Sequence, residues 1–383
     1  MAQTAGRLRV ARRETTSRHV SWLELFFDLV FVAAVARLGY LLHADPTPAG
    51  LAVFLALFVP VWWAWLSFSY YADLFGDETL VQRLAQLAAM LGAALLAISL
   101  YEGVADDSTV FAGTMAGLLL LLAALYEHAR RSEPAVRALA GWYVAGSLAG
   151  AAGWLVSLAV AAPARYVVWA VALAVNMVVS GPLAYARTAD VPRQVSHMPE
   201  RFGLFTIVVL GESLLAVVNG TIDTSWRPVA VVTALAGFVI AATLWWVYFA
   251  QFDERLIDRA LAGGRHTQLV SFWYGYGHLP VYAALAAVGI GIELAIEAAA
   301  EPDLTAAARL TLAGGAAVYL AVLTGLQLAA GRRLSRPVVA WKITAVLALL
   351  AVIPLPLSAI GAVTVVAGVL VITPLVSALL PRR

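Results

Sequence analysis

The sequence predicts an all-α polytopic integral membrane protein of about twelve transmembrane helices, arranged as two parallel six-helix repeats. Three observations lead to this prediction: an apolar composition, a regular series of apolar segments, and arginines that gather at alternate connections. Of the 383 residues, 62% are hydrophobic and 13% are charged, whereas a soluble domain is about half apolar and about a quarter charged. Such a chain must present apolar surface to lipid.

Composition also argues against several classes of protein. The net charge of +2 is too small to indicate a nucleic-acid partner, and no basic run is interleaved with aromatic residues. The chain has no cysteine, which excludes disulfides, thiolate metal sites and thiol nucleophiles. Its six histidines are scattered without metal-ligand spacing, so we expect no metal and no cofactor. The motifs of zinc peptidases, serine hydrolases and phosphate-binding loops do not occur, which disfavours an enzyme without excluding one.

The apolar segments are long enough to cross a bilayer, which takes about 20 residues of helix. The first segment contains Glu24 and Asp28 and is too long for a signal-peptide core, so we expect it to be a retained span. Pro354, Pro356 and Gly361 leave open whether the last two segments both span or form a re-entrant hairpin. The predicted spans lie near residues 20–43, 49–71, 83–102, 108–128, 136–161, 165–187, 201–220, 228–252, 268–296, 305–329, 336–358 and 361–380.

Arginines fall at every second connection between these segments. Outer loops would hold only Arg165 and Arg227, with Arg309 just inside a span, if the N-terminus is cytoplasmic. Under the positive-inside rule this alternation predicts that both termini are cytoplasmic. The arginines on the predicted cytoplasmic side include Arg83, Arg130, Arg131, Arg137, Arg187, Arg193, Arg201, Arg255, Arg259, Arg265, Arg332, Arg333, Arg336, Arg382 and Arg383.

Two aromatic blocks recur six spans apart. Residues 62–65 read Trp-Trp-Ala-Trp and residues 245–248 read Trp-Trp-Val-Tyr, and each block lies one span after a Glu-x-Phe start. A repeat of six spans would keep the halves parallel about an axis along the membrane normal. We therefore predict two repeats, residues 1–194 and 195–383. The alternative is that the tryptophan pairs are interfacial aromatic belts that match by chance.

Ionisable residues inside the spans are candidate site residues, because an unpaired charge is costly in lipid. Glu24 and Asp28 are four residues apart and share one helical face. Glu24 also fits an interfacial helix start, where the positive helix end favours a carboxylate, whereas Asp28 lies ~6 Å deeper. A functional site and a structural helix start both stay open for this pair.

Arg37 and Glu212 lie deeper in the first and seventh spans. Aligning the halves puts Ala36 and Glu212 at equivalent depths, so Arg37 and Glu212 could form an ion pair near the repeat interface. The pair would be either a proton- or substrate-linked site at the midplane or a static lock between halves. Beside Glu212, we expect Gly211 to allow close helix approach and Ser213 to add a hydroxyl.

The ninth span carries His278 among two glycines and Pro280, a pattern that predicts a kinked or interrupted helix. His278 is a candidate for titration near neutral pH, or else a hydrogen-bonding residue between helices. Lys342 and Asn176 are weaker candidates, since Lys342 can extend its ammonium to the cytoplasmic interface. A pair of glycines at positions 146 and 150 is expected to serve helix packing.

Two of these stretches resemble one bacterial family. Residues 21–32 read Ser-Trp-Leu-Glu-Leu-Phe-Phe-Asp-Leu-Val-Phe-Val, and residues 200–213 begin with Glu-Arg and end with Gly-Glu-Ser. With the two tryptophan blocks, they are similar to the bacterial low temperature requirement A family over nearly the whole chain. The resemblance implies a many-span inner-membrane protein linked by name to growth in the cold, and it implies no established chemistry. The family-like positions, without an assigned role, are Glu24, Asp28, Glu200, Arg201, Gly211 and Glu212.

The favoured hypothesis is a secondary transporter or permease with a polar midplane site between the repeats, proton coupling being left open. The alternative is an intramembrane enzyme acting on a lipid or isoprenoid, with Glu24, Asp28 and His278 around a pocket open to the cytoplasmic leaflet. A further alternative is a structural protein whose polar residues lock helices together. We expect a multi-pass protein of the bacterial inner (plasma) membrane, with lipids and a small-molecule or ion substrate as partners and no nucleic acid; a homodimer stays open.

Overall fold

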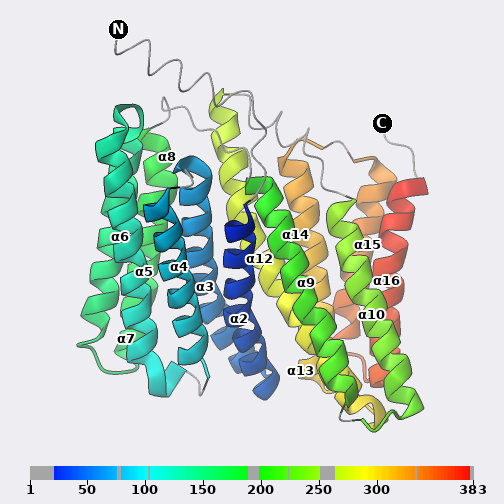
Figure 1. Cartoon of the computed structure of the whole chain (residues 1–383). Helices are drawn as coiled ribbons and strands as arrows, with labels where there is room; N and C mark the ends of the chain where they lie inside the picture. The colour runs from blue at the N-terminus through cyan, green and yellow to red at the C-terminus, as the bar shows by residue number, and fades with distance from the viewer. Residues whose placement is uncertain are drawn as a thin grey trace.

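The computed structural model describes residues 21–75, 79–101, 104–188, 198–222, 224–250, 264–332 and 334–379, and the side chains of 104–107 and 264–273 lie outside this description. Within these residues every regular element is a helix, as the composition predicts. The helices stand side by side in one bundle (Figure 1).

Each predicted span corresponds to helix in the structure. The first half contains α2 (Trp22–Ala44), α3 (Pro48–Phe75), α4 (Leu80–Ser99), α5 (Val104–Ser132), η1 (Pro134–Val136), α6 (Arg137–Ser157), α7 (Ala164–Val178), η2 (Val179–Leu183) and α8 (Ala184–Arg187). The second half contains α9 (Met198–Ile222), α10 (Pro228–Phe249), α12 (Gly264–Glu297), η3 (Ala298–Ala300), α13 (Ala306–Arg309), η4 (Leu310–Gly314), α14 (Gly315–Ala329), α15 (Arg336–Val352) and α16 (Ala359–Leu379).

The lengths of these helices fit a membrane protein with many spans. In the described part of the chain, 11 helical segments are long and apolar enough to cross a bilayer. The remaining one, α15, has 17 residues, which is at the short end of the range of about 17–25 residues. Because α16 is itself long enough to span, α15 and α16 are two separate helices rather than the halves of one span.

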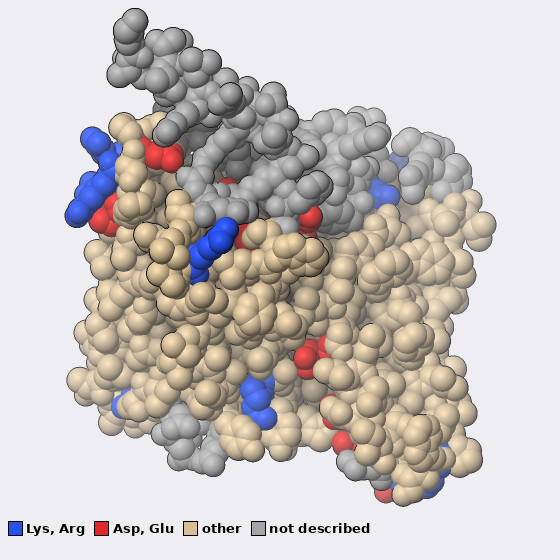
Figure 2. Space-filling model, in the orientation of Figure 1, with Lys and Arg blue, Asp and Glu red and all other residues tan. Residues whose placement is uncertain are grey.

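The charged side chains lie mainly at the two ends of the bundle, one of which holds both ends of the described chain. The start of α2 and the end of α16 lie at the same face, called the N-terminal face below (Figure 1). Figure 2 shows charged side chains mainly at the upper and lower rims, with a broad band of other residues between them and a small acidic spot inside the band. This distribution is what a lipid-facing surface requires, because charge is costly within the hydrocarbon layer.

The start of α2 explains one of the predicted site residues. The backbone N–H of Ser21 donates to Glu24 Oε2 at 2.8 Å, and the backbone N–H of Glu24 donates to Ser21 Oγ at 3.3 Å. This capping box satisfies two backbone donors that would otherwise lack a partner at the helix start. Glu24 therefore has the structural role that its position at a helix start predicted.

Three helices join the two halves in the middle of the bundle. Here α2 of the first half packs against both α9 and α12 of the second half, and α9 and α12 pack against each other. The remaining helices of each half lie to either side of this centre (Figure 1). The internal repeat itself stays a prediction.

Of the kinked or interrupted helix predicted for the ninth span, the interruption is wrong, because α12 runs without a break for 34 residues through Pro280; the kink stays a prediction. Proline removes one backbone donor, which a long packed helix tolerates. Gly277 serves packing instead: a Cβ there would lie 2.5 Å from Leu326 Cδ2 of α14. The break occurs in the sixth span, where Gly181 has φ −100° and ψ −105° just before Pro182.

Candidate functional site

A buried ion pair between Asp28 and Arg201 joins the two halves. Arg201 Nη2 lies 2.8 Å from Asp28 Oδ1, and each side chain is only 1% exposed. Asp28 is in the second turn of α2 and Arg201 in the first turn of α9, so the pair lies toward the N-terminal face. Glu200 precedes Arg201 in that first turn, where the positive helix end favours a carboxylate.

Trp65 of α3 is the third member of this cluster. Its indole Nε1–H donates to the same Asp28 Oδ1 at 2.8 Å. The indole stacks on Phe205 of α9 with ring centroids 4.2 Å apart, and the Phe27 ring lies 5.6 Å from the Arg201 guanidinium carbon. Three helices therefore hold one carboxylate oxygen in an aromatic surrounding.

The other buried polar atoms of the ion pair have no hydrogen-bond partner in the part of the chain that the structure describes. Among the described residues, Asp28 Oδ2, Arg201 Nε and Arg201 Nη1 are buried without a hydrogen bond. An unsatisfied buried group costs about 1–3 kcal/mol, and more when it is charged. A free acceptor and two free donors within one ion pair can hold water, accept a proton or bind a small polar group.

The predicted pair between Arg37 and Glu212 is wrong. Arg37 Nη2 donates to the Tyr101 carbonyl at 2.9 Å, and its guanidinium carbon lies 4.5 Å from the ring centroids of Tyr40 and Tyr101. Within the described residues no ion pair links it to Glu212. The helix turns by about 100° per residue, so Arg37 points away from its aligned neighbour Ala36 and toward the end of α4. Asp28 was thus correctly chosen as a candidate site residue, but its pairing with Arg201 was not predicted.

The residues around Glu212 also differ from expectation. Ser213 Oγ is buried and a Cβ on Gly289 of α12 would lie 2.9 Å from it, so Ser213 lies in the contact between α9 and α12. Gly211 has no atom within 4 Å of its Cβ position, and the predicted close approach at Gly211 is wrong. The glycine that permits this contact belongs to α12 instead.

His278 is a hydrogen-bonding residue between helices. Its Nδ1 lies 2.6 Å from the Tyr274 carbonyl, which can only accept, so Nδ1 carries the proton. Nε2 then accepts from the Tyr248 hydroxyl of α10 at 3.0 Å, and the ring stacks on Phe202 at 4.3 Å. Both nitrogens are satisfied in the neutral form, which favours the structural alternative over titration.

Contrary to the expectation, Lys342 does not extend its ammonium to the membrane interface. Its side chain is buried, and its Nζ donates to Gln327 Oε1 at 2.9 Å and to Thr324 Oγ1 at 3.4 Å. Both acceptors belong to α14, so the lysine fixes α15 against its neighbour.

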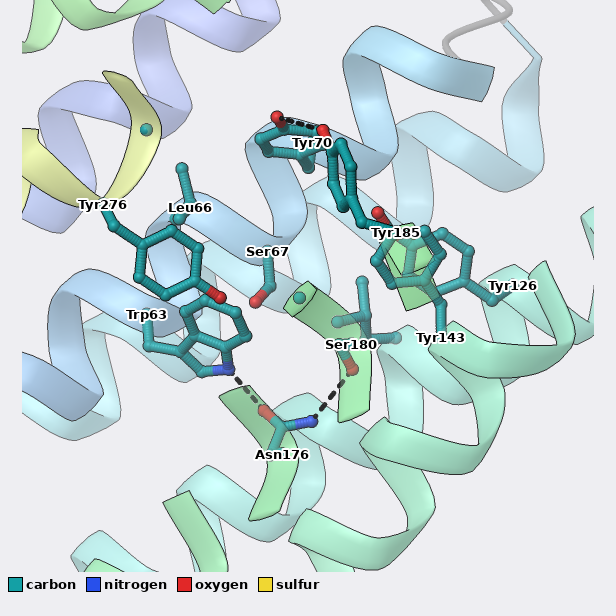
Figure 3. A pocket seen from close by; sticks show the side chains of 13 residues that line it. Trp63, Leu66, Ser67, Tyr70, Tyr126, Tyr143, Asn176, Ser180, Tyr185 and Tyr276 are labelled. Atoms are coloured by element: carbon teal, nitrogen blue, oxygen red, sulfur yellow. Dashed lines mark hydrogen bonds between the residues drawn. The ribbon is translucent and has the colours of Figure 1, made fainter. Parts of the chain in front are cut away.

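A small cavity lies mainly among helices of the first half (Figure 3). The cavity and the ion-pair cluster share α3, since Trp63 lines the cavity and Trp65, two residues later, donates to Asp28. The cavity has about 40 Å³ of room for the centres of water molecules, and one water takes about 10–15 Å³. The cavity therefore fits about three waters or one small group. Its aromatic lining consists of Trp63, Tyr70, Tyr126, Tyr143, Tyr185 and Tyr276.

The polar groups of the cavity come from several helices that meet there. Asn176 of α7 accepts a hydrogen bond from the Trp63 indole and donates to Ser180 Oγ at 3.4 Å (Figure 3). The hydroxyls of Tyr70 and Tyr185 are 3.1 Å apart. The residues that line the cavity include no charged side chain. It therefore offers hydroxyl, amide and aromatic contacts, which suit an uncharged solute.

Two glycines of α6 make this arrangement of α6 and α7 feasible. A Cβ on Gly146 would lie 2.1 Å from Ser180 Oγ, and one on Gly150 would lie 2.8 Å from Asn176 Cβ. The spacing of these glycines predicted a packing role, and this prediction is confirmed. The glycines bring α7 close to α6 and so place Asn176 and Ser180 at the cavity.

The change Gly150→Ala is expected to lower the free energy of unfolding by about 1–3 kcal/mol, as overpacking does. The added Cβ meets Asn176 Cβ, which can move only if the two helices separate. Thermal unfolding in detergent measures the effect. Gly113→Ala in α5 is the control, because nothing lies within 4 Å of its Cβ position. Equal unfolding temperatures for the two variants would contradict the packing role.

Sequence reasoning missed the role of Arg201 and most of the cavity. Arg201 was assigned to the cytoplasmic rim, where a positive charge needs no partner. The available signal was its opposite charge to Asp28 at a similar distance from a helix start. The tyrosines Tyr126, Tyr143 and Tyr185 are far apart in the sequence, and only the fold brings their rings together.

The fold and the buried site define a polytopic helical membrane protein with one ion pair enclosed between its helices. The model of the family described as bacterial low temperature requirement A protein (LtrA) matches residues 19–373, and the chain belongs to this family. The resemblance noted in the sequence is thereby confirmed. The chain is also similar to Uncharacterized protein RA0937 of Rhizobium meliloti (strain 1021), with 28% identity over 302 residues, which cover 74% of this chain and 72% of that protein. No solved structure matches the chain.

Proposed function

We propose that this protein is a proton-coupled secondary transporter of the bacterial inner membrane, with both termini in the cytoplasm. The observation that carries the proposal is the buried Asp28–Arg201 pair, which joins the halves and keeps unsatisfied polar atoms. An ionisable residue within a span is by default a candidate for a proton or substrate pathway. The arginine alternation supports cytoplasmic termini.

Asp28 is well placed to couple proton binding to movement of the halves. Its Oδ1 accepts from both Trp65 and Arg201, while Oδ2 has no hydrogen-bond partner among the described residues. A proton can therefore add to Oδ2 before either existing hydrogen bond breaks. The neutral carboxyl then holds Arg201 only as a hydrogen-bond acceptor, which weakens the link between α2 and α9.

The cavity is the proposed substrate site. It lies mainly in the first half, but Tyr276 of α12 supplies one wall from the second half. A movement of α12 relative to the first half would therefore open or close the cavity, as alternating access requires. Its uncharged lining favours a small neutral solute that travels with the proton taken up at Asp28.

The intramembrane enzyme is less well supported. That alternative needs Glu24, Asp28 and His278 around one pocket, and none of the three lines the cavity. Glu24 caps α2, and both nitrogens of His278 are already bonded. Among the described residues that line the cavity there is no carboxylate and no imidazole, so the groups that this alternative invokes are not supplied there.

The absence of native cysteine allows a direct test of alternating access. Ser67 lines the cavity, so Ser67→Cys in the otherwise unchanged chain reports the accessibility of the cavity. We expect a membrane-impermeant maleimide to label this cysteine from either face, in right-side-out and in inside-out vesicles. Lower pH, and the change Asp28→Asn, should alter the ratio of the two labelling rates, because both remove the charge of Asp28.

Ser147→Cys is the matched control, because Ser147 is buried in α6 and is not among the residues that line the cavity. It should resist labelling from both faces. Labelling of Ser67→Cys from one face only, at every pH and with or without Asp28→Asn, would contradict the transporter and leave the enzyme or structural alternative.

A further inference from the structure

A second cluster of charged residues lies at the face opposite the N-terminal face. His43 is near the end of α2, and Glu293 and Glu297 are near the end of α12. One ligand atom from each residue lies within 4.8 Å of the others. His43 Nε2 is 3.1 Å from both carboxylate oxygens of Glu297. The histidines are scattered in the sequence, so this grouping appears only in the fold.

The two carboxylates of the cluster carry more negative charge than its histidine can neutralise. Glu293 and Glu297 are one helical turn apart on α12, where like charges repel each other. A neutral His43 leaves two negative charges, and a protonated His43 still leaves one. Within the described residues, no lysine or arginine forms an ion pair with either glutamate. The site therefore favours a positive ion.

The ligand types narrow the kind of ion. Imidazole nitrogen and carboxylate oxygen are both ligand types that Zn²⁺ and other first-row transition metals accept, whereas Ca²⁺ and Mg²⁺ prefer oxygen ligands alone. Metal–ligand bonds of about 2.0–2.2 Å place two ligands of one ion at most about 4.4 Å apart, so the three side chains, with ligand atoms within 4.8 Å of one another, would close in on a bound ion. Because the residues are half-buried or exposed, water can complete the coordination.

We propose that His43, Glu293 and Glu297 form a binding site for a divalent transition-metal ion that bridges α2 and α12. This site is independent of the transport proposal. It links the first half to the second at the face opposite the Asp28–Arg201 pair, so a bound ion would fasten the centre of the bundle at its other end. A ligand that binds only the folded state also stabilises the protein.

A titration with Zn²⁺ tests the site. The full-length, untagged protein in detergent is first treated with a chelator and then titrated, and calorimetry measures its unfolding temperature. We expect one specific site whose occupation raises the unfolding temperature. His43→Gln should weaken Zn²⁺ binding by at least about tenfold, since even the loss of a group that only orients a ligand costs about 10–100-fold. Glu297→Gln should have a similar effect, and it serves as the second variant.

The control is His128→Gln, because His128 is an exposed histidine on α5 outside the cluster. It should leave Zn²⁺ binding unchanged. His43→Cys provides a positive test: it introduces the sole thiol of the chain, which should bind Cd²⁺ and give an ultraviolet thiolate charge-transfer band. Equal Zn²⁺ affinity for wild type, His43→Gln and Glu297→Gln would overturn the proposal, as would absence of binding to wild type.

Discussion

Replacing Asp28 by alanine is expected to lower the free energy of unfolding by about 3–5 kcal/mol, which is the cost of breaking a buried ion pair from one side. The loss arises mainly because the Arg201 guanidinium stays buried without its counter-charge. Reversible unfolding in mixed detergent micelles measures it. Arg37→Ala is the matched control for loss of a charge in a span, since Arg37 contacts a carbonyl and two rings rather than a carboxylate.

A double-mutant cycle separates the pair from its surroundings. Asp28→Ala combined with Arg201→Ala should cost clearly less than the sum of the single changes, because the double variant leaves no isolated charge. If the two effects add within about 0.3–0.5 kcal/mol, Asp28 and Arg201 do not stabilise each other, and the proposed coupling between the halves loses its basis.

Trp65→Ala is expected to have a similar effect of about 3–5 kcal/mol, as for other large aromatic residues in cores. Trp65 is fully buried, stacks on Phe205 and meets Tyr282 edge to face. The change removes this packing and also one of the two donors to Asp28 Oδ1. The same unfolding measurement applies.

Trp65→Phe divides the effect into its two parts. Phenylalanine keeps a ring against Phe205 but cannot donate to Asp28, so a loss of about 1–3 kcal/mol is expected. Trp22→Ala is the control, because Trp22 is 87% exposed and surface changes usually stay within about 0.5 kcal/mol. A loss for Trp65→Phe as large as that for Trp65→Ala would place the whole effect in the hydrogen bond.

Hydropathy and arginine positions were sufficient to predict the helices, because a span must be long and apolar whatever its neighbours are. They were not sufficient to predict which helices touch. A helix such as α10 is apolar on every side, since lipid and protein neighbours are equally apolar, and its sequence marks no inward face. The predicted partner of Arg37 was wrong for this reason: depth was readable from the sequence, but rotation was not.

The candidate site was predictable only in part, because the sequence shows the depth of a charged residue but not its partner. Asp28 was selected because a carboxylate at that depth needs a partner, and the structure supplies Arg201. The role of Arg201 could not be predicted, because an arginine at a helix start fits the membrane interface without any partner. The cavity and the histidine–glutamate cluster draw on side chains from separate helices, so neither leaves a local motif.

The distance of 173 residues between Asp28 and Arg201 also bears on how the protein is made. Membrane helices are inserted in the order of synthesis, so α2 enters the bilayer before its counter-charge exists. An aspartate at the centre of an inserting helix costs about 2.5–3.5 kcal/mol, and the position of Asp28 nearer a helix end reduces this cost. The insertion of α9 is then the step that neutralises α2. The first six predicted spans alone would lack both this cation and the wall that Tyr276 gives the cavity.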